Sequence, residues 1–133
     1  MKANLSLTNR NGFSLVEVLA AVGIIGIIAF LAIPNIVAIK DQSEKDLAIS
    51  KAQALNMAIA SYIQANGREV AETDYNIPTT DALRYKKLTP YMAFAPDKLS
   101  DYEPNGYTFN LPDDLASLSP TTIQDADDND VPY

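Results

Sequence analysis

Residues 12–33 read GFSLVEVLAAVGIIGIIAFLAI, and they decide the organisation of this 133-residue chain. The part from 18 to 33 holds only apolar residues and glycine, and a second apolar run, 36–39, follows Pro34. A helix over residues 18–39 is about 33 Å long, enough to cross the hydrocarbon core of a bilayer. Glu17 places one carboxylate in this segment, where a charge costs roughly 2.5–3.5 kcal/mol on insertion scales. Glu17 is therefore expected to have a specific partner.

The helical pattern continues well beyond the apolar run. Residues 40–46 are all polar, and Lys40 and Glu44 are spaced to pair one helical turn apart. Apolar residues then recur in steps of three and four, which predicts one buried stripe on a helix. The stripe is Ala48, Ala52, Leu55, Ile59 and Tyr62, flanked by Ile63. We expect one helix over 13–66, kinked at Pro34 and ended by Gly67.

The remainder of the chain predicts short elements only, because seven of the eight prolines lie in 68–133. A short helix is expected over 81–88, with Thr80 or Asp81 as its N-cap. The turn at Asn105 and Gly106 should lead into a strand over 107–111. These elements predict an α+β fold in which the second half of the long helix packs on a small, loop-rich antiparallel sheet.

Composition argues against several function classes. The chain has no cysteine and no histidine, which removes thiol nucleophiles, Cys/His zinc sites and the usual general base. Residues 13–133 carry all 17 acidic side chains but only eight of the ten basic ones, and such an acidic body should repel nucleic acid. A hydrolase using Asp113 and Asp114 is a weak alternative, since adjacent acids in a proline-rich loop rarely share a preorganised site.

Residues 1–12 are short and polar, with Lys2 and Arg10 but no acid, which predicts a cytoplasmic N-terminus. An ordinary secretory signal peptide needs a small-x-small cleavage site after the apolar run, and residues 29–32 do not supply one. A plain single-span anchor explains the apolar run but leaves Glu17 unexplained.

The motif at 12–17, the apolar run behind it and the segment 34–36 closely resemble the leader and N-terminal helix of type IV pilins and pseudopilins. The resemblance covers about residues 10–66. It implies a pilin fold with a leader peptide at 1–12, a transmembrane and filament-core helix at 13–39, and a periplasmic head at 40–133 that includes helix 40–66.

The same resemblance implies cleavage by a prepilin peptidase between Gly12 and Phe13, followed by N-methylation of Phe13. Cleavage would free an amino group one helical turn before Glu17, so that this cation could neutralise the carboxylate within one subunit or between neighbours. The implied partners are other copies in a homo-oligomeric filament, other pseudopilins or minor pilins, an assembly ATPase and an inner-membrane platform.

Two further stretches resemble the major pseudopilins of type II secretion systems, namely residues 77–80 (IPTT) and 88–91 (LTPY). The chain lacks the tryptophan that those proteins commonly carry in the next segment. It also lacks the cysteines with which many type IV pilins close their C-terminal region. The missing tryptophan counts against placement among the major pseudopilins, whereas the absence of cysteine favours a pseudopilin and leaves a cysteine-free major or minor pilin as the alternative.

The acidic tail, residues 125–130, offers clustered oxygen ligands of the kind that calcium prefers. EF-hand geometry is ruled out, because Asp130 stands where the glycine should be. Major pseudopilins bind calcium near the C-terminus, yet their ligands have no residue-by-residue match here. Two interpretations stay open: a solvated tail, or a calcium site. The candidate ligands are Asp125, Asp127, Asp128 and Asp130.

The expected function is therefore that of a structural subunit of a type IV pilus-like filament, acting in protein export and without enzymatic activity. No cofactor is required, and calcium is optional. The subunit is expected to start as a single-pass inner-membrane protein with its head in the periplasm. A membrane-anchored periplasmic binding module that never polymerises is the alternative of another class.

Overall fold

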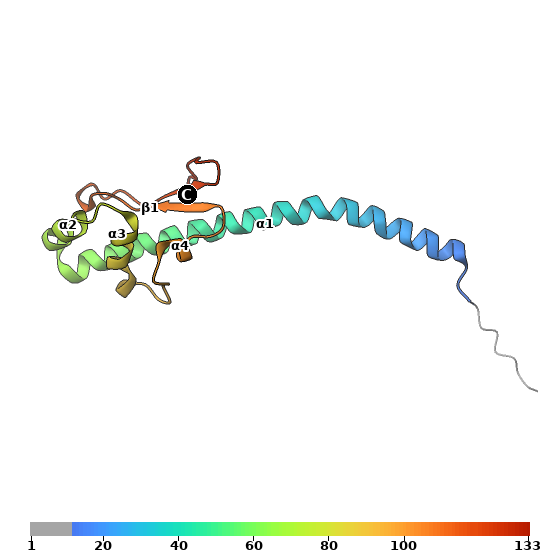
Figure 1. The fold of residues 1–133 in the computed structure, drawn as a ribbon, viewed down its shortest axis with the longest axis horizontal. Helices are drawn as coiled ribbons and strands as arrows, with labels where there is room; N and C mark the ends of the chain where they lie inside the picture. Colours follow the sequence, from blue (N-terminus) through green and yellow to red (C-terminus); the bar gives the residue numbers. More distant parts are fainter. Residues whose placement is uncertain (1–11) are drawn as a thin grey trace, which may run out of the picture. The chain divides into compact units, whose positions relative to one another are not determined.

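The computed structural model describes residues 12–133. The predicted leader therefore lies outside the described residues, apart from Gly12. The chain divides into two compact units with the boundary between Ile39 and Lys40. Helix α1 (Leu15–Asn66) contributes to both units, and the remaining elements belong to the second one, here called the head (Figure 1).

Helix α1 has the C-terminal limit that the sequence predicts and begins two residues later than predicted. Ser14 precedes it, and its carbonyl accepts hydrogen bonds from the backbone N–H groups of Glu17 and Val18 at 3.0 and 3.2 Å. Serine is a favoured residue at this position, which accounts for the start at Leu15. Gly67 follows the helix with φ 80° and ψ 148°, a combination that glycine adopts without a Cβ clash.

The head adds short elements to the second half of α1. These are α2 (Arg68–Asn76), α3 (Asp81–Leu88), the 3-10 turn η1 (Thr89–Tyr91), α4 (Leu99–Tyr102), β1 (Tyr107–Asn110), the 3-10 turn η2 (Leu115–Ser117) and β2 (Thr122–Asp125). Helix α3 has the bounds predicted from its sequence and follows Thr80, although no side-chain cap bond forms there. Strand β1 starts at Tyr107 as predicted and ends one residue early. The α+β class is confirmed.

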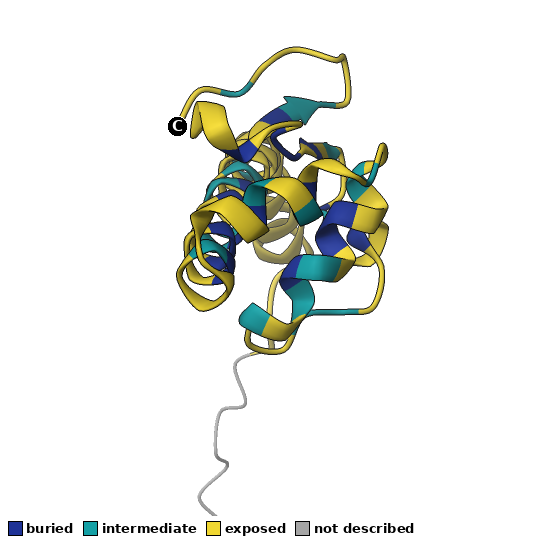
Figure 2. Cartoon of the chain, turned by 90° about the vertical axis from the view of Figure 1, so that its left-hand side faces the viewer, coloured by how far each residue is buried: buried dark blue, intermediate teal, exposed yellow. Residues whose placement is uncertain are grey.

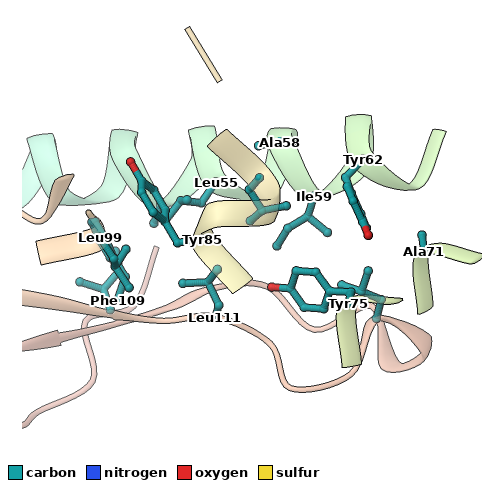
Figure 3. Close-up of a cluster of buried hydrophobic side chains, with 14 of the residues drawn as sticks. Leu55, Ala58, Ile59, Tyr62, Ala71, Tyr75, Tyr85, Leu99, Phe109 and Leu111 are labelled. Carbon is teal, nitrogen blue, oxygen red and sulfur yellow. The ribbon is translucent and has the colours of Figure 1, made fainter. Parts of the chain in front are cut away.

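Strands β1 and β2 form a two-stranded antiparallel sheet in which Phe109 lies opposite Ile123. Both side chains are buried, so this pair joins the sheet to the core. The predicted apolar stripe of α1 forms the other wall: Ala48, Ala52, Leu55, Ile59 and Tyr62 are all buried. Figure 2 shows the buried positions on the inner sides of the head elements. In Figure 3, Leu55 and Ile59 point from α1 toward the Tyr75 and Leu111 side chains.

Candidate functional site

The N-terminal motif lies at the start of α1. Gly12, Phe13 and Ser14 precede the helix, and Glu17 lies in its first turn, where a carboxylate interacts favourably with the helix dipole. Phe13 is four positions before Glu17 and is 86% exposed. The region thus presents an accessible Gly12–Phe13 peptide bond close to a single acid.

The surface of the first half of α1 is apolar on every side. Its large apolar side chains are half to four-fifths exposed, from Val18 at 50% to Phe30 at 79%. An 18-residue window here has a mean hydropathy of 2.7 and no buried residue, so this helix is long and apolar enough to cross a membrane. Glu17 is the one charged residue between positions 12 and 39. Such a surface requires lipid or other protein around it.

Two glycines lie on this surface. A Cβ atom placed on Gly23 or Gly26 would meet nothing within 4 Å. Glycine and alanine allow helix backbones to approach closely, and residues 20, 23, 26, 29 and 32 supply them in steps of three. They spiral around the helix, so they permit close neighbours on more than one side.

Pro34 lies inside α1 and brings no backbone N–H. The side chain of the next residue, Asn35, donates a hydrogen bond to the Leu31 carbonyl at 3.4 Å. The Asn35 amide thus adds one hydrogen-bond donor to the helical turn in which Pro34 supplies no backbone N–H. The helix continues through this turn, and the kink predicted there stays a prediction.

A polar cluster joins the end of α1 to α2 and α3. The Tyr62 hydroxyl and the Lys87 ammonium both donate to Asp74 Oδ2, at 2.5 and 2.7 Å. The bond from Lys87, followed by that from Tyr62, lowers the pKa of Asp74. Burial and the neighbouring Asp74 carboxylate raise the pKa of the Tyr62 hydroxyl. These shifts in pKa favour the ionised form of the Asp74 carboxyl and the protonated form of the Tyr62 hydroxyl, so the cluster serves as a structural clamp.

The two acids of the hydrolase alternative have separate partners. Asp113 pairs with the buried Arg84 at 2.7 Å. Asp114 accepts from the Ala116 backbone N–H at 2.9 Å, which starts η2, and from the Asn76 side chain at 2.7 Å. The bond from Ala116 lowers the pKa of Asp114. These contacts give both carboxylates structural tasks and bring them to no common site.

The acidic tail forms a local hydrogen-bonded turn in which residues 126–130 are exposed. Asp125 ends β2, and its Oδ1 accepts from the backbone N–H groups of Asp127 and Asn129, both at 2.9 Å. These bonds, that of Asn129 first, lower the pKa of Asp125. Asp130 forms an isolated bridge with Gln124. Within residues 12–133, no group of three acids is placed to hold a metal ion, and calcium binding stays a prediction.

The chain is similar to known proteins both in its N-terminal motif and over most of its length. A model of the prokaryotic N-terminal methylation motif matches residues 7–33. The chain is similar to proteins named type II secretion system core protein G: 34% identical over 109 residues in Aeromonas hydrophila, and 30% over 106 residues in Escherichia coli K12. Each match covers 79% of this chain and 66% of the relative.

The corresponding protein of Dickeya chrysanthemi is 31% identical over 109 residues, covering 79% of this chain and 62% of that one. The chain thus spans about two thirds of the length of the relatives it matches. No solved structure gives a significant match.

Proposed function

Because this chain belongs to the pseudopilins of the type IV pilin superfamily, we propose that it is a structural subunit of a filament in a type II secretion system. One observation supports this most directly. The first half of α1 is apolar all round and exposed, and its single charge, Glu17, sits in the first turn behind the methylation motif.

The physical properties of the two units suit a subunit that exists first in the membrane and then in a filament. As a membrane protein, the chain keeps residues 15–39 in lipid, with its N-terminus cytoplasmic and its head outside the membrane. A prepilin peptidase then cleaves between Gly12 and Phe13, and Phe13 is methylated. During assembly, the apolar half exchanges lipid for the apolar helices of other copies, which conserves its burial while changing its neighbours.

Glu17 selects the correct position of each incoming subunit. Cleavage leaves an α-amino cation on Phe13, four residues before the carboxylate. In an apolar bundle an unpaired carboxylate is strongly unfavourable, so a subunit is stable only where Glu17 reaches such a cation. Other pseudopilins, a cytoplasmic assembly ATPase and an inner-membrane platform are the proposed partners. The work is assembly, and no step of catalysis is assigned to this chain.

The variant Glu17→Leu separates this proposal from the anchored binding module. We expect loss of at least nine-tenths of the filaments sheared from cells, with an unchanged amount of protein in the membrane, because the cation loses its partner. Glu44→Gln, in the polar segment behind the apolar half, is the matched control and should assemble normally. The mass of the N-terminal peptide checks processing, which should begin at methylated Phe13.

Two results would refute the proposal. One is normal filament yield from Glu17→Leu, which the non-polymerising module predicts. The other is an unprocessed N-terminus in the membrane-resident protein. A pilin differs from a pseudopilin in its machinery, and deletion of the type II secretion genes rather than the pilus genes should abolish filaments here.

A further inference from the structure

Two bulky apolar residues of the head have an unusual backbone conformation. Between residues 12 and 133, the non-glycine residues with positive φ are Phe94 (57°), Leu118 (51°) and Asp128 (61°). Aspartate tolerates this left-handed region through local hydrogen bonds, whereas phenylalanine and leucine are disfavoured there. Glycine or asparagine would be the expected residue at 94 and at 118.

Neither residue gains burial in return for this strain. The Phe94 side chain is 103% exposed and that of Leu118 is 66% exposed. Each position therefore combines backbone strain with an apolar side chain in water. Leu118 ends the 3-10 turn η2, and its backbone N–H donates to the Leu115 carbonyl. Strained residues cluster at functional contacts, and exposed apolar side chains mark interaction surfaces, so both residues are candidates for a contact outside the chain.

Leu118 forms one wall of an apolar groove of about 230 Å³. Ile59 and Ile63 of α1 line it on one side, and Leu115, Leu118 and Pro120 line it on the other. Ala60, Asn56 and Ser119 complete the lining. An apolar cavity of about 150 Å³ accepts benzene, so the groove has room for the ring of a phenylalanine.

Phe94 lies on a different side of α1 from this groove. The preceding residues, 91–93, line a second hollow together with Met57 and Ser61 of α1. At about 100° per residue, the α1 positions of the two hollows are centred roughly 160° apart around the helix axis. One copy therefore presents the ring on one side of its head and the groove nearly opposite.

Both surfaces also lack charge. Residues 40–133 carry 16 of the 17 acidic and eight of the ten basic side chains, so two heads repel each other. The groove lining contains no charged residue, and neither does the segment 91–96, which reads YMAFAP. Contact through these two surfaces brings copies together without juxtaposing their carboxylates.

We propose that the Phe94 side chain of one subunit inserts into the groove beside Leu118 of the next copy. The ring and the groove occupy different surfaces, so the contact is heterologous and can repeat from one copy to the next, as a helical filament requires. This contact rests on the proposed filament function, and it adds a contact between the globular heads of neighbouring copies to the packing of the apolar helices.

Cross-linking tests the contact directly, because the chain contains no cysteine. The double variant Phe94→Cys/Ala60→Cys, assembled into filaments and treated with a short bis-maleimide, should give a ladder of trimers and larger species. Each single variant should give no ladder. Leu83→Cys/Ala60→Cys is the matched control, since Leu83 is also exposed, at 52%, and should give no ladder either.

The variant Phe94→Asn tests the role of the ring. Asparagine relieves the strain, so head melting should be unchanged or slightly higher, while filament yield falls roughly 10- to 100-fold with the loss of a buried phenyl ring. Filaments that give no ladder, products that stop at dimers, or cross-links only to a different protein would each overturn the contact. Failure of the cysteine-free chain itself to form filaments would instead overturn the proposed function.

Discussion

Both halves of α1 are helical, but they differ in burial: only the second half is covered by other parts of the chain. In the first half, large apolar side chains from Leu15 to Ile39 are 50–79% exposed. In the second half, the stripe from Ala48 to Tyr62 is at most 8% exposed. The second half has polar residues on its outer face, whereas the first half has apolar residues on all faces.

This difference shows where each half obtains its tertiary packing. An amphipathic helix needs one covering surface, which residues 68–133 of the same chain provide. A helix that is apolar all round needs neighbours on every side, and a head of this size has none to offer. The same secondary structure therefore marks a folded domain in one half and an assembly surface in the other.

The largest expected effect comes from removing one buried side chain. Leu55 is fully buried, and Leu55→Ala should lower the free energy of unfolding of the head by about 2–5 kcal/mol. Ile25→Ala removes as much from the exposed half and should leave head unfolding unchanged. All seven tyrosines lie between positions 62 and 133 and the chain has no tryptophan, so tyrosine fluorescence in urea reports the head alone. Equal destabilisation by the two variants would contradict this division.

An intermediate effect is expected at the boundary between α1 and α2. Gly67→Ala should destabilise the head by about 1–3 kcal/mol, because φ 80° with ψ 148° is strained for any residue with a Cβ, although no atom lies within 4 Å. Gly26→Ala, in helical backbone, should have no effect on the same measurement. An unchanged free energy of unfolding in Gly67→Ala would show that the backbone of the turn can adopt another conformation without loss of stability.

The smallest effect concerns pH. The folded pKa of Asp74 lies below its ordinary value of 3.8, so its ionised form stabilises the head above that value, and this contribution is lost as the pH falls through the folded pKa. Solvent screening keeps the effect small, because the side chain is 48% exposed. Urea midpoints between pH 5 and 2 should fall more steeply for the natural chain than for Asp74→Asn. Parallel curves would assign the loss to Asp114, Asp125 and other acids.

Local sequence signals were sufficient for the long helix, for α3 and for β1. The stripe from Ala48 to Tyr62 has strict helical spacing, and Gly67 and Gly106 mark turns that require positive φ. Helix α2 was missed because Gly67 ended the predicted helix, and the polar run behind it has few apolar residues. Its signal was the four-residue spacing of Ala71 and Tyr75, the two side chains it buries.

Contacts between distant residues were beyond local prediction. Strand β2 has one buried residue, Ile123, and the acidic residues at its end are typical of a solvated tail. Its pairing with β1 depends on Phe109, which lies opposite Ile123 and 14 positions before it in the sequence. The clamp at Asp74 unites three elements, and the left-handed conformations of Phe94 and Leu118 contradict the preferences of those residues. The N-terminal motif needed no such contact, because Glu17 is unusual through its own neighbours in the sequence.

The packing of β1 and β2 against α1 also determines the order of events during synthesis. The stripe that ends at Tyr62 is only partly covered by α2 and α3, and its cover is complete only when Ile123 has been added, 61 residues later. At about 5–20 residues per second, this takes on the order of 3–12 s. The membrane segment is complete well before that interval begins. The nascent chain is therefore anchored in the membrane first and folds its head last. In the interval, the apolar stripe of α1 is accessible to chaperones.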